Sequence, residues 1–267
     1  MSTKTYILLA IIVIFLIYIS IQIKYFKINK VILNNDEICN DLNIVQITDF
    51  HNNKLINKNR LIEEIKNIDP DVIFLTGDII DAKTKDFSYS LNIVKDLMDI
   101  TEKIYFVWGN HELRNTKGEE FVGELKNIGV IVLDDENIKC QIANNKINII
   151  GLNFFIDEKD YNKAIEGIDE KDYNIILSHS PNRPLRYLNG KEDLILSGHT
   201  HGGQVRLPII GAVIAPGQGY FPKYDKGLFE LENSILYIDS GLGNSIFPIR
   251  FLNRVQISNV LVKSNMK

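Results

Sequence analysis

The sequence predicts an α/β protein: a four-layer α/β/β/α sandwich of two mixed sheets, preceded by one N-terminal transmembrane helix. Short apolar runs alternate with amphipathic stretches in the first half of the chain, and apolar runs dominate the second half. Residues 5–23 carry no charge. Continuous apolar strands separated by helices are typical of parallel sheets buried on both faces. Two such sheets with helices outside give four layers.

The N-terminal helix is predicted from the run ILLAIIVIFLIYISI at residues 7–21. At about 1.5 Å per residue, this segment is just long enough to cross a hydrocarbon core of roughly 30 Å. A cleaved signal peptide usually has a shorter apolar region and a small-residue cleavage site, whereas here the run leads into Lys24, Tyr25, Phe26 and Lys27. An uncleaved anchor is favoured, with a signal peptide or a buried core helix as alternatives.

The charges that flank this helix bear on its orientation. Lys4 and the amino terminus stand on one side, and Lys24, Lys27 and Lys30 stand on the other. The positive-inside rule therefore favours a single-pass protein with a cytoplasmic catalytic domain, by a margin of one charge.

Strand and helix patterns follow in order along the rest of the chain. In the first half, helical spacing at 61–68, 90–97 and 119–127 separates predicted strands at 42–48, 72–76 and 104–108. In the second half, strands are predicted at 147–152, 174–177, 193–197, 234–238 and 255–262. Residues 207–224 are rich in Gly, Pro and aromatic residues, which predicts a long loop or hairpin.

The chain of 267 residues divides into an anchor with its juxtamembrane segment at 1–30 and one catalytic domain at 31–267. A net charge of -4 provides no basic field for nucleic acid, which is not an expected partner. Cys39 and Cys140 are far apart, so a thiolate metal site is not expected. Two buried free thiols are favoured, and a single disulfide is the alternative.

Polar clusters follow five of the predicted strands. Ligands of open α/β sheets bind beyond the carboxyl ends of strands, so these clusters predict one shared pocket. All five histidines of the chain belong to the clusters, which packing alone explains poorly. The clusters are Asp49-Phe50-His51, Gly77-Asp78, Gly109-Asn110-His111-Glu112, His179, and Gly198-His199-Thr200-His201.

The donor types of these clusters indicate a metal centre. Imidazole, carboxylate and amide oxygen suit Mn, Fe, Zn or Co, and the absence of thiolates argues against structural zinc. More donors are present than one tetrahedral ion uses, so two divalent metal ions are inferred. Paired ions about 3.5–4 Å apart can clamp the attacking and leaving oxygens of a phosphoryl displacement.

With these motifs in order, the sequence resembles the calcineurin-like metallophosphoesterase superfamily, whose members carry D-x-H, G-D-x-x-D, G-N-H-[DE], a lone His and G-H-x-H. The resemblance implies that Asp49, His51 and His201 hold one metal. Asn110, His179 and His199 would hold the other, with Asp78 bridging. A metal-bridged hydroxide would be the nucleophile, and manganese would be the first choice of metal.

The resemblance also implies roles beside the metals. His111 would be the general acid that protonates the leaving oxygen. Asp81 and Glu112 would orient metal ligands from outside, or would be ordinary solvated carboxylates. Gly202 and Gly203 would let the backbone pass close to metals or substrate. Arg250 would bind a phosphate oxygen, or would form a surface ion pair.

Two further segments, Gly202-Gly203-Gln204-Val205 and Pro248-Ile249-Arg250-Phe251, resemble a membrane-anchored bacterial branch of the superfamily. Some members of that branch are phosphodiesterases or UDP-2,3-diacylglucosamine pyrophosphatases of glycolipid synthesis. The resemblance therefore implies a membrane-anchored hydrolase of phosphodiester or pyrophosphate bonds, with a lipid or glycolipid precursor as a candidate substrate.

Two alternatives remain open. One is a cell-surface phosphatase or nucleotide phosphodiesterase that acts on soluble substrates. The other is an inactive metal-binding scaffold tethered to the membrane, which the presence of His111 and every expected ligand disfavours. With no long insertion before His179, the site is expected to be open, with residues 207–224 as its wall or as a hairpin packed beneath it.

Overall fold

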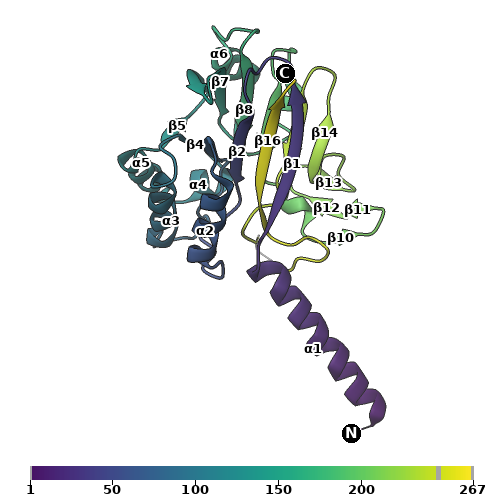
Figure 1. The fold of residues 1–267 in the computed structure, drawn as a ribbon. Helices are drawn as coiled ribbons and strands as arrows, with labels where there is room; N and C mark the ends of the chain where they lie inside the picture. Colours follow the sequence, from purple (N-terminus) through teal and green to yellow (C-terminus); the bar gives the residue numbers. More distant parts are fainter. Residues whose placement is uncertain (1, 245–247, 266–267) are drawn as a thin grey trace.

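A computed structural model describes residues 2–244 and 248–265 of the chain. Helix α1 (Thr3–Lys24) projects away from the rest of the molecule (Figure 1). Ile19 is its one buried residue, and the helix is long and apolar enough to cross a membrane. A signal sequence has the same properties, so the helix by itself does not separate the two possibilities.

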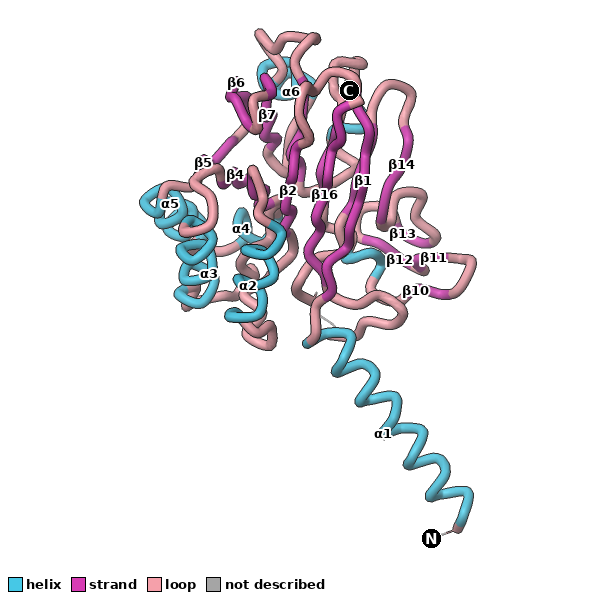
Figure 2. Tube along the Cα trace, in the orientation of Figure 1, coloured by secondary structure: helices cyan, strands magenta, loops and turns pink. Residues whose placement is uncertain are grey.

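The first large sheet has six strands, and helices cover one of its faces (Figure 2). Strands β2 to β5 are parallel, whereas β16 runs antiparallel to β2 and parallel to β1. The strands in spatial order are β1 (Lys27–Asn35), β16 (Gln256–Ser264), β2 (Leu42–Ile47), β3 (Val72–Leu75), β4 (Ile104–Val107) and β5 (Ile131–Leu133).

The second large sheet is also mixed. Its four inner strands are parallel, and an antiparallel strand closes each edge. The strands in spatial order are β14 (Gly227–Glu230), β15 (Ile235–Ile238), β9 (Leu194–Ser197), β8 (Tyr173–Ser178), β7 (Asn145–Leu152) and β6 (Glu136–Ile142).

Alternating side chains of these strands fill separate cores. In β2, Ile44 packs between the two sheets with Phe74 and Leu177. Its neighbours Val45 and Ile47 face the outer helices, which are α2 (Lys58–Ile68), α3 (Ser88–Met98) and α5 (Gly118–Ile128). Helix α6 (Glu158–Ala164) covers the outer face of the second sheet. The predicted α/β sandwich with two mixed sheets is confirmed.

Strand β1 was not predicted from the sequence. It alternates Lys and Asn with apolar residues and lies at a sheet edge, where only Leu33 of the strand is buried. Edge strands commonly carry charge, which weakens their hydrophobic pattern. The domain boundary proposed at residue 30 falls inside this strand.

Residues 207–224 fold largely into two small hairpins, one of the two forms expected from the sequence. The first pairs β10 (Arg206–Leu207) with β11 (Gly211–Ala212), and the second pairs β12 (Ile214–Ala215) with β13 (Gly219–Tyr220).

Cys39 and Cys140 are both free. The expectation of two buried thiols is wrong, because Cys39 is exposed and Cys140 is only half-buried. Cys39 lies in the turn between β1 and β2, where the backbone rather than the side chain is held in place. The N–H groups of Cys39 and Asn40 donate to Asn145 Oδ1 at 2.8 and 3.0 Å.

Candidate metal centre

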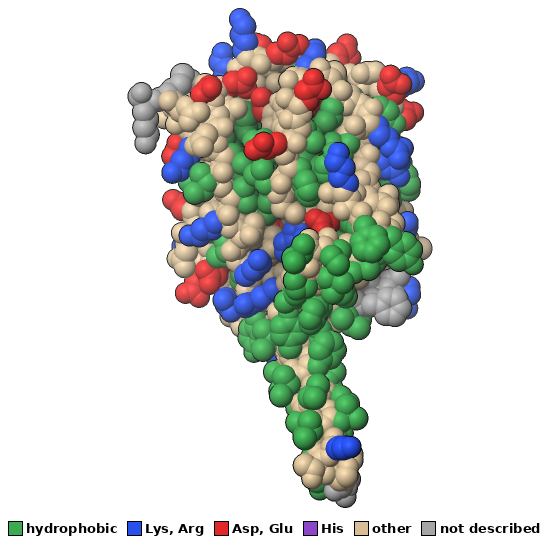
Figure 3. Space-filling model, turned by 90° about the vertical axis from the view of Figure 1, so that its right-hand side faces the viewer, with side chains coloured by type: hydrophobic (Ala, Val, Ile, Leu, Met, Phe, Trp, Pro, Cys, Tyr) green, Lys and Arg blue, Asp and Glu red, His purple; other side chains and the backbone are tan. Residues whose placement is uncertain are grey.

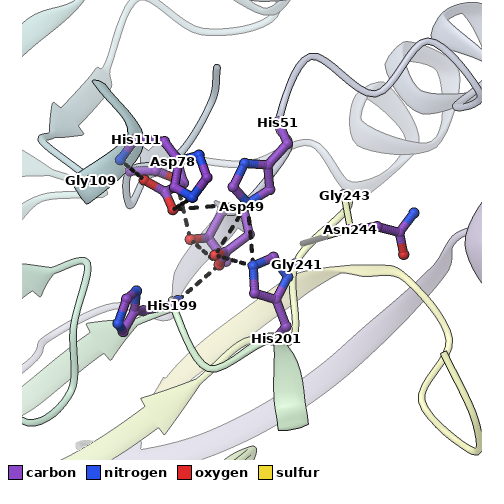
Figure 4. A network of polar contacts seen from close by, with 12 residues as sticks. Asp49, His51, Asp78, Gly109, His111, His199, His201, Gly241, Gly243 and Asn244 are labelled. Atoms are coloured by element: carbon purple, nitrogen blue, oxygen red, sulfur yellow. Dashed lines mark hydrogen bonds and ion pairs between the residues drawn. The ribbon is translucent and has the colours of Figure 1, made fainter. Parts of the chain in front are cut away.

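The ends of five strands meet at one edge of the sandwich and bring the predicted polar clusters together. Asp49 and His51 follow β2, Asp78 follows β3, His179 follows β8, and His199 with His201 follow β9. The short helix α4 (Asn110–Arg114), which begins three residues after the end of β4, supplies Asn110 and His111. Figure 4 shows His51, His199 and His201 around Asp49, with Asp78 and His111 beside them.

Asp49, His51 and His201 form one compact group of potential ligands, and all three are buried. His201 Nε2 lies 3.4 Å from Asp49 Oδ1 and 3.3 Å from His51 Nε2. These are the three residues expected to share one metal ion. Their ligand atoms face one another, as one shared cation requires.

Asp78, His179 and His199 form a second group. His179 Nε2 lies 3.0 Å from Asp78 Oδ2 and 3.2 Å from His199 Nδ1. Asp78 Oδ2 is also 3.9 Å from His51 Nε2 of the first group. Asp78 therefore stands between the two groups, where a bridging carboxylate would have to lie.

Two buried oxygen atoms at the site have no hydrogen-bond partner: Asp49 Oδ1 and Asn110 Oδ1. Buried polar atoms without partners are costly and rare. A carboxylate oxygen and an amide oxygen are both ligands of divalent transition metals. The donor set thus fits metal ions, including the asparagine expected to bind one.

The backbone at the site is in an uncommon conformation. Five of the expected ligands have positive φ: Asp49, His51, Asp78, His199 and His201, with values between 49° and 68°. Such non-glycine residues cost free energy and persist where the surrounding structure determines them, often at functional sites. The strand ends are bent so that these side chains point inward.

Burial leaves the rings of His51 and His199 neutral at pH 7, whereas the ring of His179 stays protonated. Burial alone would lower the pKa of His179, but the neighbouring Asp78 carboxylate raises it to about 10, so a metal must displace a proton from that ring. His179 Nδ1 lies 2.8 Å from the Thr76 carbonyl and donates to it, so its Nε2 faces Asp78. Burial lowers the pKa of His51 to about 4 and that of His199 to about 3. A neutral imidazole is the form that binds metal.

Glu112 holds the backbone around the second group. Its Oε2 accepts the N–H groups of Asp78 and Gly109 at 2.8 and 3.0 Å, and its Oε1 accepts that of Ile80 at 3.1 Å. The residue is 1% exposed, so it is not the ordinary solvated carboxylate considered as an alternative. It fixes the loop that carries Asp78 against the loop that carries Asn110.

His111 lies beside both groups and is held from behind. The Ala82 N–H donates to His111 Nδ1 at 3.1 Å, and Asp81 Oδ2 is 3.2 Å from the same nitrogen. Because Nδ1 accepts the Ala82 bond, Nε2 carries the proton of the neutral ring. Nε2 is 3.9 Å from Asp78 Oδ2, so this N–H lies at the edge of the metal groups.

Arg250 differs from both expectations about its role. Its side chain is fully buried, so it is not in a surface ion pair. It does not line the cavity over the metal groups, where a phosphate oxygen would lie. Its guanidinium donates to the Ser240 and Gly243 carbonyls at 2.6 and 2.7 Å and lies 3.4 Å from His201 Nδ1. Arg250 supports the loops under His201.

Gly202 and Gly203 both have positive φ, at 58° and 73°. A Cβ on Gly203 would lie 2.2 Å from the Ala212 Cβ, and one on Gly202 would meet the Asn253 side chain at 2.9 Å. The close approach that requires glycine is therefore to the β10–β11 hairpin and the C-terminal segment. The two segments that carried the bacterial resemblance are joined, because the Phe251 N–H donates to the Gln204 carbonyl at 3.0 Å.

An open cavity of about 850 Å³ lies over the metal groups. Asp78, Asn110, His111, His199 and His201 line it, and Pro216 with Gly217 close one side, which confirms the 207–224 segment as a wall. Six further lining residues were missed from the sequence: Ala82, Lys83, Arg114, Phe154, Phe155 and Arg183. Arg114 and Arg183 lie three and four residues after His111 and His179, and this spacing was the available clue.

Comparison with known proteins agrees with this geometry. Residues 42–203 match the family model described as calcineurin-like phosphoesterase. The chain is 28% identical to metallophosphoesterase YkuE of Bacillus subtilis, over 83% of this chain and 79% of YkuE. It is 30% identical to YkoQ of the same organism, over 81% of this chain and 82% of YkoQ.

A more distant relative is the transmembrane protein with metallophosphoesterase domain of Bos taurus, 25% identical over 84% of this chain. The match covers 54% of that longer protein. Among solved structures, the sulfate thiohydrolase SoxB of Thermus thermophilus superposes with a TM-score of 0.52 and 11% identity. That superposition covers 85% of this chain and 57% of SoxB, and it supports the fold alone.

Proposed function

Because the chain belongs to the calcineurin-like phosphoesterase family and is a metal-dependent phosphoesterase, we propose that it hydrolyses phosphodiester or pyrophosphate bonds at a membrane. One observation carries the proposal: two groups of buried ligands face each other across Asp78 beneath an open cavity. A compact two-metal site under an open cavity suits an extended phosphoester.

In this proposal Asp49, His51 and His201 hold one divalent cation. Asn110, His179 and His199 hold the other, and Asp78 belongs to both. Two divalent cations would activate water and neutralise phosphoryl charge. Two Mn ions are proposed, and Fe, Zn or Co are the alternatives.

His111 is the proposed general acid. Its Nε2–H lies at the edge of the ligand groups, and in the neutral ring its Nδ1 accepts the Ala82 N–H. To act as the acid, the ring would carry protons on both nitrogens, with Nδ1–H turned toward Asp81 Oδ2. Nε2 would give its proton to the leaving oxygen, the ring would become neutral, and solvent in the open cavity would return the proton. Asp81, 38% exposed, would hold the ring in this orientation and stabilise its charged form.

The membrane part of the proposal is based on α1. An uncleaved helix would make the chain a single-pass membrane protein. The catalytic domain would lie on the cytoplasmic side, because Lys24, Lys27 and Lys30 exceed Lys4 and the amino terminus by one charge. The open cavity then favours a lipid or glycolipid precursor. Protease digestion of intact cells should leave the domain uncut, and cleavage would place it outside.

A second candidate is hydrolysis of a soluble phosphoester. Lys83, Arg114 and Arg183 line the cavity and could bind the additional phosphates of a nucleotide. This alternative predicts that a soluble polyphosphate ester is cleaved as well as any lipid.

The test uses the full chain in detergent, stripped of metal and resupplied with Mn²⁺. Bis(p-nitrophenyl) phosphate and p-nitrophenyl phosphate would be compared for the protein and for His111→Ala. We expect diester hydrolysis that requires metal and falls about 10²–10⁴-fold in the variant. Exposed Lys126→Ala on α5 is the matched control and should behave as the original chain. A folded, metal-loaded protein that cleaves neither ester would favour the scaffold.

A further inference from the structure

Exposed apolar side chains gather at the end of the domain from which α1 emerges. Figure 3 shows apolar surface continuing from the helix onto the domain. We call six of these residues the apolar collar. They come from the two small hairpins and the C-terminal segment, and they are 50–107% exposed: Ile209, Ile210, Ile214, Tyr220, Phe221 and Leu252.

Direct contacts fix α1 against this end of the domain. The Leu252 N–H donates to the Tyr18 hydroxyl at 2.9 Å, and the Phe251 ring lies 5.6 Å from that of Tyr18 and 6.5 Å from that of Phe15. Phe251 is in turn bonded through the backbone to Gln204 and Arg206, where the first hairpin starts. The helix and the collar are thus parts of one surface.

The length of α1 determines where this surface must lie. Its 22 residues span about 33 Å, and a hydrocarbon core is roughly 30 Å thick. If α1 spans the bilayer, nearly all of its length must lie inside the hydrocarbon core. Phe15 and Tyr18 then lie within the membrane. Residues that contact them, including Leu252, must then also enter the membrane surface.

A second cavity connects the collar with the metal centre. It has a volume of about 360 Å³, and its lining includes Ile214 of the collar, Ala215, Pro216, Gly203 and His201. His201 and Pro216 also line the large cavity that contains His111. Thr200 and Gln204 also line the cavity, and the Thr200 hydroxyl donates to the Asp225 carbonyl. Ile214, Ala215, Pro216 and three glycines make the rest of the wall apolar, which suits a hydrocarbon chain.

We propose that the apolar collar inserts into the bilayer surface and that the smaller cavity holds the hydrocarbon tail of a lipid whose phosphoester lies at the metal groups. The substrate class is therefore a membrane-resident lipid phosphoester. This inference rests on the proposed function for the chemistry but not for the collar, which can be tested without activity.

The collar is tested with the full chain in nanodiscs. The protein has a single tryptophan, Trp108, which gives the baseline emission. Tryptophan would be introduced in Ile209→Trp, and in Lys139→Trp on exposed β6 as the matched control. Lipids brominated on their acyl chains should quench the added emission of Ile209→Trp and not that of Lys139→Trp. If the tryptophan at 209 is not quenched, the collar does not enter the bilayer. This includes the case in which its emission shifts to the blue because a second copy of the chain covers it.

The cavity is tested with Ile214→Trp, which narrows it, and with Leu228→Trp on β14 as the control. Each is assayed on a dioleoyl phosphatidyl p-nitrophenol ester in nanodiscs and on bis(p-nitrophenyl) phosphate. We expect the ratio of kcat/KM for the lipid to that for the soluble ester to fall about tenfold in Ile214→Trp, or about 1.4 kcal/mol. An unchanged ratio overturns the tail site.

The two failures can be distinguished. If the original chain hydrolyses neither ester with metal present, the proposed function fails, while the quenching result still decides the collar. If it hydrolyses the soluble ester and Ile214→Trp leaves the ratio unchanged, the phosphoesterase stands and the lipid tail site is wrong.

Discussion

Single residues of the metal centre were predictable because each one directly follows an apolar strand. Asp49, Asp78 and His179 lie where their motifs place them. Glu112 holds three backbone N–H groups, as the orienting role implied by its motif requires. Arg250 takes neither of the roles expected for it and is buried under His201. The contact between Arg250 and His201 joins segments 49 residues apart in the sequence, so no local pattern predicts it.

Glu112→Gln tests the role of Glu112 at this scale. The amide NH₂ cannot accept a hydrogen bond, so at least one of the N–H groups of Asp78, Ile80 and Gly109 loses its partner. We expect the free energy of unfolding to fall by about 1–3 kcal/mol and metal affinity to fall about 10–100-fold. Denaturant titration and metal-binding calorimetry measure the two effects. Glu119→Gln, exposed on α5, should change neither.

Gly198→Ala and Gly123→Ala form a matched pair at the scale of the element. A Cβ at Gly198, after β9, would lie 2.1 Å from Thr48 Oγ1 and 2.4 Å from Asp49 Oδ2, whereas one at Gly123 in α5 meets nothing within 4 Å. We expect Gly198→Ala to displace Asp49 and reduce metal binding. Gly123→Ala should stabilise the protein by about 0.5–1 kcal/mol. Thermal unfolding measures both variants, and an equal fall in their melting temperatures would contradict the expected difference between the two glycines.

Asp193 connects β9 to β8 and makes the free energy of unfolding depend on pH. Its carboxylate accepts the Asn174 N–H at 2.7 Å, but burial, with the Glu37 carboxylate adding to it, raises the pKa of Asp193 to about 7. The folded state therefore keeps a proton that the unfolded chain releases above about pH 4. This contribution to stability is full below about pH 4 and is lost as the pH rises through 7.

Asp193→Asn removes that titration. Relative to the variant, the original chain should lose stability between about pH 4 and pH 7, as measured by denaturant unfolding at each pH. Parallel curves for the two proteins would show that Asp193 does not titrate in this range.

At the scale of the whole molecule, the sequence indicated two sheets but not how β1 completes the first one. A chain that starts at residue 31 lacks the paired residues Lys27–Lys30 and the buried ring of Phe26, whereas a chain that starts at Tyr25 keeps them. Burial of one Phe side chain stabilises by about 1.5–3 kcal/mol. The shorter chain should therefore melt about 5 °C lower. Equal melting temperatures would mean that β1 adds nothing.

The four strands of the large sheets that were missed, β1, β5, β6 and β14, all lie at sheet edges. One side of an edge strand has no neighbour, and polar residues are tolerated there. Polar residues interrupt the apolar runs of β1, β6 and β14, and β5 has only three residues. The inner strands, buried on both faces, have continuous apolar runs that are visible in the sequence. The collar also escaped prediction, because only the folded chain brings the hairpins and Leu252 to the end of α1.

A metal titration tests most directly whether the protein is a two-metal phosphoesterase. The stripped full chain would receive Mn²⁺ in small steps while bis(p-nitrophenyl) phosphate hydrolysis and bound metal are measured together. The account predicts activity that saturates at two ions per chain, and loss of one bound ion in His179→Ala. Full activity with one ion, or none with Mn, Fe, Zn or Co at two ions per chain, would contradict it.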